Sequence, residues 1–159
     1  MQFSVEEIFM IGEKLHTNQI EAANRAEATS ILIRGGNRVY RPEADVSGED
    51  LVIRRPNGKL LPVQMKGRPM VQWSLYGGKG IWMLFPDPLG EIPGRHWFLI
   101  EHDILFNWFK EQHGTTTGWE NRSRNREPEW SERRLSDKLR KFLRKYKLPI
   151  ASASDTDDI

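Results

Sequence analysis

The sequence contains no cysteine, no long apolar run and none of the short motifs that identify many nucleotide-binding proteins and hydrolases. Without cysteine there are no disulfides and no thiolate metal ligands, which is compatible with a reducing compartment. No apolar segment approaches the length of a membrane span, and the N-terminus lacks the basic-then-apolar order of a signal peptide. A G-x-x-x-x-G-K-[ST] phosphate loop and a G-x-S-x-G nucleophile elbow are both missing. We therefore expect a cytoplasmic protein with no membrane partner and none of these chemistries.

What the chain does contain is typical of one folded domain. Its 159 residues are 38% hydrophobic, with six tryptophans and seven phenylalanines, which is enough for a proper core. The net charge is only +2, but Lys and Arg are concentrated over residues 122–147, and phosphate binding needs such a cluster. We expect a single domain over residues 1–150, with a core over 18–112 and a basic helix over about 130–147. An acidic tail over 151–159 is expected to be disordered.

The best-defined element is a β-hairpin. Its strands are predicted over Asp50–Arg55 and Leu60–Lys66, two runs rich in branched apolar residues. The residues between them suit a bulged three-residue loop, because Pro56 presets φ, Asn57 tolerates the next position and Gly58 can adopt a left-handed φ.

The loop length determines the register of the hairpin. With a three-residue loop Asp50 faces Gln64, and Lys66 lies two residues further on along the same face. A two-residue loop would instead pair Asp50 with Met65 and place Asp50 on the opposite face. Pro62 removes one ladder donor and is the weakest point of the predicted pairing.

A carboxylate, an amide oxygen and a lysine at one end of a hairpin form a site for a hard cation and an activated water. Mg²⁺ takes oxygen ligands and keeps several waters, and a nearby lysine can offset charge that develops on a phosphate. The pattern of Asp50, thirteen further residues and Gln64-x-Lys66 resembles the PD-(D/E)xK nuclease superfamily, with Gln64 where that family more often has Glu. The resemblance covers about residues 18–68 and implies a restriction-endonuclease-like α/β fold, a bound Mg²⁺ or Mn²⁺, and DNA as the substrate.

The resemblance also implies a metal-site glutamate on the helix before the hairpin. A helix is predicted from about Asn18 to Arg34. On a helical projection Glu27 lies in a stripe of apolar and small residues, whereas Glu21 points away and is explained as the reaching-back acid of a cap begun by Asn18. The stripe consists of Ile20, Ala23, Glu27, Ser30 and Ile31. We expect Glu27 to complete the metal site, with Glu21 as the substitute and a salt bridge from Glu27 to an arginine as the alternative.

The remaining patterns predict the α/β class with a mixed sheet flanked by helices, because helices and strands alternate and the hairpin is antiparallel. The other predicted elements are an N-terminal helix over about 4–15, a strand over 37–42, buried strands over 81–85 and 96–100, and a helix over 104–112 capped by Asp103. Met70–Tyr76 is ambiguous between a helical turn and an extended segment. His102, at a strand end, is a peripheral candidate for the site.

The basic helix predicted over 130–147 has one apolar side and is otherwise surrounded by Lys and Arg. It suits packing on the domain, binding of a phosphate backbone or docking of a second subunit, and the sequence leaves these three alternatives open. If the ligand is nucleic acid, the expected contacts are Arg68, Arg133, Arg134, Lys138, Lys141 and Lys145.

Three functions are consistent with these patterns. The first is a metal-dependent nuclease in which Asp50, Gln64 and Glu27 hold the ion, while Lys66 orients or deprotonates the attacking water. The second is a non-catalytic nucleic-acid-binding or protein-assembly module on the same fold, because Gln64 removes a negative charge and should weaken metal affinity. The third is an interaction domain whose aromatic-rich segment over 73–109 supplies a homodimer surface.

Overall fold

The computed structural model describes residues 15–44, 48–119 and 128–149, so the acidic tail and nearly all of the predicted N-terminal helix lie outside the described residues. In chain order, the elements are α2 (Thr17–Arg34), β1 (Arg38–Tyr40), β2 (Leu51–Arg54), β3 (Leu60–Met65), β4 (Met70–Gln72), α3 (Trp73–Tyr76), β5 (Trp82–Pro86), β6 (Trp97–Glu101), α4 (His102–His113), β7 (Glu129–Ser131), α6 (Asp137–Leu143) and the 3-10 helix η1 (Arg144–Tyr146). Within these ranges no helix is both long enough and apolar enough to cross a membrane.

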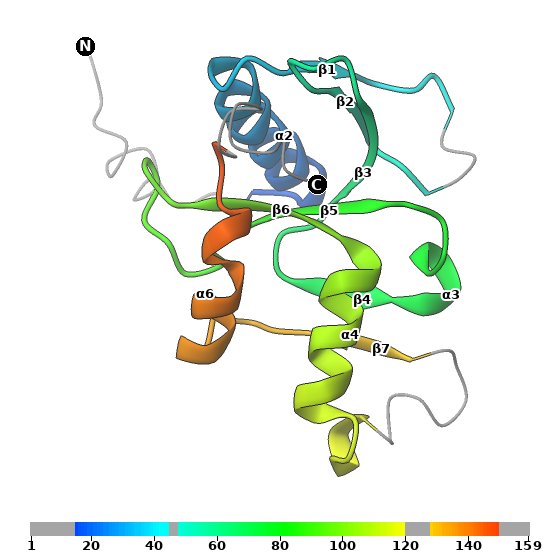
Figure 1. Ribbon diagram of the computed structural model, residues 1–159. Helices are drawn as coiled ribbons and strands as arrows, with labels where there is room; N and C mark the ends of the chain where they lie inside the picture. Colours follow the sequence, from blue (N-terminus) through cyan, green and yellow to red (C-terminus); the bar gives the residue numbers. More distant parts are fainter. Residues whose placement is uncertain (1–14, 45–47, 120–127, 150–159) are drawn as a thin grey trace.

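The main sheet has five strands in the order β1-β2-β3-β5-β6 (Figure 1). The pair β3 and β5 is parallel, and the other three pairs are antiparallel. A parallel pair needs a crossover connection, which the chain makes through β4 and α3. Strand β4 also pairs with β7 in a second, two-stranded sheet. The predicted α/β class, with a mixed sheet that contains an antiparallel hairpin, is confirmed.

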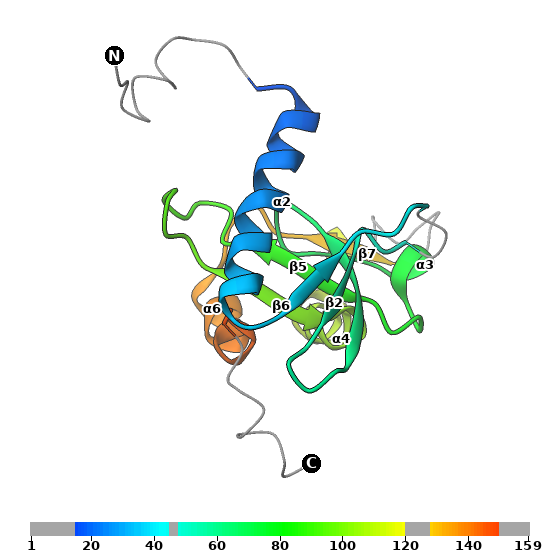
Figure 2. The same cartoon turned by 90° about the horizontal axis from the view of Figure 1, so that it is seen from above.

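Helices cover both faces of the main sheet, with α2 on one side and α4 and α6 on the other (Figures 1 and 2). Successive residues of β5 point to opposite layers: Met83 and Phe85 pack on the α4–α6 side, and Leu84 packs on the α2 side. Burial on both faces explains why the apolar runs over 81–85 and 96–100 are continuous. These runs form β5 and β6, each one residue later than predicted.

The β2–β3 hairpin adopts the predicted three-residue loop. Arg55 N–H donates to the Lys59 carbonyl at 2.8 Å, and Gly58 N–H donates to the Arg55 carbonyl at 2.8 Å. Gly58 has a φ of 88°, in the left-handed region that glycine adopts at little cost. The turn chemistry of the sequence was therefore sufficient to select the loop.

The register of the hairpin follows from this loop. The ladder runs from the turn to the pair Leu51 and Val63. Just beyond it the Asp50 N–H donates to the Val63 carbonyl at 2.7 Å, and the predicted meeting of Asp50 with Gln64 is made by their side chains, with Gln64 Nε2 donating to Asp50 Oδ2 at 2.9 Å. Pro62 does not disturb the sheet, because the parallel ladder to β5 begins only at Val63. The missing N–H of Pro62 therefore removes no bond from that ladder.

The start of α2 differs from the prediction. His16 is the N-cap residue, and its N–H donates to Oε1 of Gln19 at 2.8 Å. The predicted cap by Asn18 and Glu21 is wrong. The Glu21 carboxylate therefore takes no part in capping α2.

The face that α2 buries is also different from the prediction. Ala28 and Leu32 are buried against the sheet, whereas Ile20 of the predicted stripe is 46% exposed. The buried face is offset from the predicted face by one residue, which is about 100° on a helix. Apolar residues are spread around this helix, so their periodicity does not select one face.

The C-terminal segment is not the continuous helix predicted over 130–147. Glu129–Ser131 forms β7, in which Trp130 pairs with Val71 of β4. The pairing joins segments far apart in the chain and leaves no local signal in the sequence. Arg133 and Arg134 consequently precede the helix instead of lying on it.

The basic helix α6 begins only at Asp137. Ser136 is its N-cap, and Oγ of Ser136 accepts the Leu139 N–H at 3.2 Å. Leu139 and Leu143 are buried and anchor the helix to the core. The predicted apolar side is therefore real, but it belongs to a helix of seven residues followed by η1.

Three further local predictions are resolved by the structure. Met70–Tyr76 forms both of the alternatives, with β4 followed by the helical turn α3. Asp103 does not cap α4, because Glu101 is the N-cap residue and Asp103 lies in the first turn. The predicted strand over 37–42 is the edge strand β1.

The N-cap of α6 gives a stability prediction. Ser136→Ala should lower the free energy of unfolding by about 1 kcal/mol, because the Leu139 N–H loses its acceptor. Urea denaturation followed by circular dichroism measures this change. The matched control is Ser30→Ala, at an exposed position inside α2, which should be neutral or slightly stabilising because alanine favours helix. Equal effects of the two substitutions would contradict the assigned start of α6.

Candidate functional site

The site begins with a contact between Asp50 and Gln64. Asp50 directly precedes β2, and its Oδ2 accepts hydrogen bonds from Gln64 Nε2 at 2.9 Å and from Met65 N–H at 3.2 Å. Gln64 is 8% exposed, so its amide is held in place by the surrounding sheet. The hairpin register therefore turns two residues that are 14 positions apart into direct neighbours.

Lys66 extends this arrangement beyond the end of β3. Its N–H donates to the Leu84 carbonyl of β5 at 2.9 Å, which keeps the backbone aligned with the parallel ladder. Its side chain is half-buried, and Nζ lies 5.6 Å from the centre of the Tyr76 ring. A cation over an aromatic face is stabilised by the ring quadrupole, so Tyr76 helps to position the ammonium group.

A cavity of about 210 Å³ opens at these residues. It is lined from the hairpin by Asp50, Gln64, Met65, Lys66 and Gly67, and from α2 by Glu21, Asn24 and Arg25. The three residues Asp50, Gln64 and Lys66 are thus brought together as the sequence predicts. The helix contributes Glu21 to the cavity because its true packing face is rotated by one residue from the predicted one. Asn24 and Arg25 were missed for the same reason.

Glu27 is not among the residues that line this cavity, and the prediction that it faces Asp50 is corrected. Its carboxylate binds Arg95, with Nη2 to Oε2 at 2.6 Å and Nε to both oxygens at 3.0 Å. Arg95 Nη2 also donates to Asn24 Oδ1 at 2.8 Å. The alternative of an arginine salt bridge is therefore what the structure contains. An arginine 68 residues away in the chain leaves no local signal near Glu27.

The cavity offers oxygen donors for a hard cation. They are the carboxylates of Asp50 and Glu21 and, after rotation of its amide, Oε1 of Gln64. Among the residues that the structure describes, no group of three or more His, Cys, Asp or Glu side chains is placed to hold a metal ion. Two carboxylates and one amide suit a Mg²⁺ that keeps several of its waters, and do not suit an ion enclosed entirely by protein ligands.

The predicted nucleic-acid contacts separate into two groups. Arg68, Arg133 and Arg134 line one cavity of about 470 Å³, because Glu132 N–H donates to the Pro69 carbonyl at 3.0 Å and joins the two segments. This cavity is next to the Asp50 site along the chain, since Gly67 lines the one and Arg68 the other. Lys138, Lys141 and Lys145 line a different surface between α4 and α6.

His102, the peripheral candidate, is buried and is not among the residues that line the cavity. Its Nε2 accepts the Gln72 N–H at 3.0 Å, so Nδ1 carries the proton and donates to Asp103 Oδ1 at 2.8 Å. Burial lowers the pKa of His102 from its ordinary value of 6.5, and the hydrogen bond to Asp103 opposes this shift. The His102 ring lies 5.6 Å from the Tyr76 ring, and His102 therefore supports the residue over which Lys66 lies.

Comparisons with known proteins give little guidance on function. No protein-family model and no curated protein sequence matches the chain. Among solved structures, the bacterial homing endonuclease I-Ssp6803I is similar at a TM-score of 0.49 and 15% sequence identity, over 84% of this chain and 88% of that one. A similarity at this level establishes neither a shared fold nor a shared activity, so function has to be derived from the side chains.

The burial of His102 predicts how stability depends on pH. The unfolded chain binds a proton at this residue as the pH falls through about 6.5, whereas the folded chain binds it only at lower pH. Stability should therefore fall below pH 6.5, by at most about 1.4 kcal/mol per pH unit from this residue. Urea midpoints between pH 8 and pH 5 measure the effect. His102→Gln should reduce this dependence, and His96→Gln, at an exposed position, is the control. Parallel pH profiles for the wild type and His102→Gln would refute the assignment.

Proposed function

We propose that this chain is a nuclease of the PD-(D/E)xK type that hydrolyses DNA with Mg²⁺ or Mn²⁺. The observation that carries the proposal is the hydrogen bond between Asp50 and Gln64 at a cavity that Lys66 also lines. These are the three positions on which the resemblance to the superfamily rests. The three side chains meet at one cavity that α2 also lines, whereas the side chains of a merely solvated hairpin would face solvent.

The residues that would hold the ion are Asp50, Gln64 through Oε1, and Glu21 in the place first expected for Glu27. When bound, such an ion lowers the pKa of a coordinated water and offsets charge on a phosphoryl oxygen. Asp50 would be oriented for this role by its hydrogen bond from the Met65 N–H, which does not depend on the orientation of the Gln64 amide.

Lys66 has a separate role in the proposed reaction. Its ammonium group is half-buried at the same cavity and lies over Tyr76, which limits its freedom to move. We assign it to orient the attacking water and to offset the negative charge that develops at phosphorus. Its removal should therefore affect the reaction more than it affects ion binding.

The DNA backbone would be held by the adjacent arginine cavity. Arg68 follows the site directly in the chain, and the pairing of β4 with β7 brings Arg133 and Arg134 next to it. Exposed arginines bind phosphate oxygens without reading sequence, so this cavity would position a strand and would not select a sequence.

Substitution of the site residues tests the proposal. Asp50→Ala should abolish Mg²⁺ or Mn²⁺ binding in titration calorimetry and lower nicking of supercoiled plasmid by at least about 100-fold. Lys66→Ala should keep ion binding and lose about 100-fold in nicking, while Lys59→Ala, which removes an exposed hairpin lysine, should change neither. Glu21→Gln should weaken ion binding. Removal of the ion with EDTA should stop cleavage.

Two results would reject the proposal. Cleavage that survives EDTA or Asp50→Ala would place the chemistry elsewhere in the chain. If neither the wild type nor the variant binds metal or cuts DNA, the chain is a nucleic-acid-binding module on this fold, which is the second function that the sequence allows.

The neutral amide at position 64 gives a further prediction. Gln64→Glu should raise Mg²⁺ affinity about tenfold or more, because it adds a negative charge next to Asp50. Without metal the same substitution should lower stability by about 1 kcal/mol or more, since two carboxylates then repel each other. Calorimetry and urea denaturation measure the two effects. Gln112→Glu adds the same charge on α4, outside the site cavity, and is the control. Unchanged Mg²⁺ affinity in Gln64→Glu would show that this side chain does not face the ion.

A further inference from the structure

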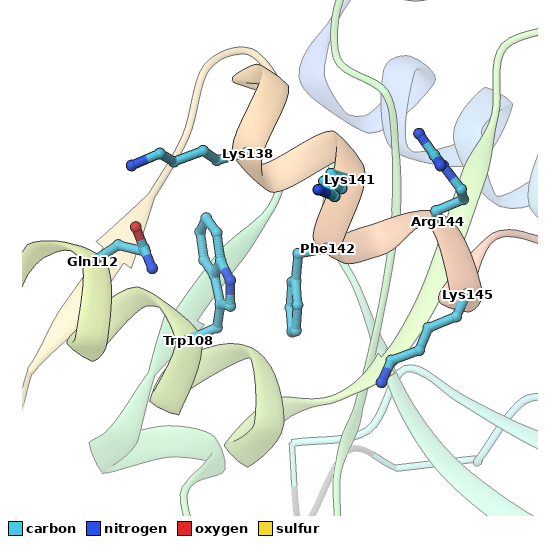
Figure 3. A pocket seen from close by; sticks show the side chains of 7 residues that line it. All are labelled: Trp108, Gln112, Lys138, Lys141, Phe142, Arg144 and Lys145. Atoms are coloured by element: carbon cyan, nitrogen blue, oxygen red, sulfur yellow. The ribbon is translucent and has the colours of Figure 1, made fainter.

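A second basic surface lies between α4 and α6 (Figure 3). We call it the α4–α6 groove and define it by the residues that line it: Trp108, Gln112, Lys138, Lys141, Phe142, Arg144 and Lys145. Its volume is about 730 Å³, within the range of roughly 300–1,000 Å³ that is typical of ligand sites. It shares no lining residue with the cavity at Asp50 or with the arginine cavity. The proposed cleavage chemistry therefore does not account for it.

Two aromatic side chains form the centre of the groove. The Trp108 and Phe142 rings stack with their centres 5.0 Å apart and their planes 15° apart, and Figure 3 shows them standing side by side. Both side chains are only half-buried, although each packs against the buried core on the α4–α6 side. The core thus fixes the two rings in place and leaves part of their surface accessible.

Four cations line the same groove as this aromatic pair, and one of them, Lys145, has its Nζ 5.1 Å from the centre of the neighbouring Tyr146 ring. Lys138, Lys141, Arg144 and Lys145 are all exposed, and no acidic side chain lines the groove. In the part of the chain that the structure describes, none of the four forms an ion pair. Arg140, on the same helix, is different: its Nη1 binds Asp87 Oδ2 at 2.9 Å. Helix α6 therefore uses Arg140 to attach itself to the domain and presents Lys138 and Lys141 at the groove, while Arg144 and Lys145 come from η1.

We propose that the α4–α6 groove binds single-stranded nucleic acid. Fixed aromatic rings surrounded by unneutralised cations are the combination that single strands require, because bases stack on the rings and phosphates bind the cations. The Trp108 and Phe142 rings are already in contact, so a base adds to the outside of this stack and does not enter between them. Duplex DNA buries its base faces in its own stack and can use only the charges.

The inference rests on the proposed function only in taking nucleic acid as the ligand. A cleaving enzyme would use the groove to hold an unpaired strand while the duplex lies at the Asp50 site. The groove itself needs neither the ion nor the catalytic carboxylate. Binding can therefore be tested in a chain that is unable to cut.

The test uses the full chain carrying Asp50→Ala, in EDTA, with a fluorescein-labelled twelve-residue oligothymidylate followed by anisotropy. Four phosphate contacts predict that log K falls against log salt with a slope of about −3. Lys138→Gln with Lys141→Gln should halve this slope. Trp108→Ala should weaken binding about tenfold and leave the slope unchanged, because stacking involves no charge.

The matched control removes the same charge elsewhere. Lys59→Gln with Lys79→Gln, both exposed and outside the groove, should bind like the parent chain. An abasic strand of equal length should bind about tenfold more weakly than the oligothymidylate and should be insensitive to Trp108→Ala. These results together would establish a site that uses both bases and phosphates.

Other results would overturn the inference. Equal binding of the abasic strand and the oligothymidylate would mean that the groove is only an anion-binding surface. If Trp108→Ala instead dissociates a dimer in size-exclusion chromatography, the occupant is a second copy of the chain. If the chain with native Asp50 does not cut DNA but still binds the single strand, the proposed function is rejected and this inference is kept.

Discussion

The site depends on the register of one hairpin. Side chains alternate between the faces of a strand, so a slip of one residue would pair Asp50 with Met65 and separate it from Gln64. The three-residue loop closed at Gly58 excludes that slip, and the parallel ladder to β5 holds the far end of β3. Local turn geometry therefore determines whether an oxygen-rich cavity exists at all.

Within that register, the amide of Gln64 changes the electrostatics of the site. An amide can donate to Asp50, so the pair is satisfied without a cation, whereas two carboxylates at the same distance would repel each other until a cation neutralised them. The pair is therefore stable without a metal, and in the proposed nuclease this neutral amide would attract the ion less strongly than a carboxylate would. Lys66 and Glu21 line the same cavity, so the groups that a hydrolytic reaction would need are present there.

The charges of the protein are distributed over two surfaces with different physical character. The arginine cavity next to the Asp50 site contains Trp130, whose indole N–H is bound by Glu132 at 2.9 Å. The α4–α6 groove has two stacked rings and no acid among its lining residues. The first surface suits the backbone of a strand, and the second also offers ring faces to unpaired bases. A net charge of +2 conceals this arrangement, because acids elsewhere in the chain balance it.

The sequence by itself determined the features that depend on neighbouring residues: the loop at Gly58, the continuous apolar strands, and therefore the meeting of Asp50 with Gln64 and Lys66. Only the tertiary structure decided which face of α2 is buried, and so placed Glu21 instead of Glu27 at the cavity. Pairing with β4 also makes Glu129–Ser131 a strand, β7, where the sequence predicts the start of the C-terminal helix. The reason is the same in each case: the deciding partners, such as Arg95 for Glu27, lie far away along the chain, and a local pattern contains no information about them.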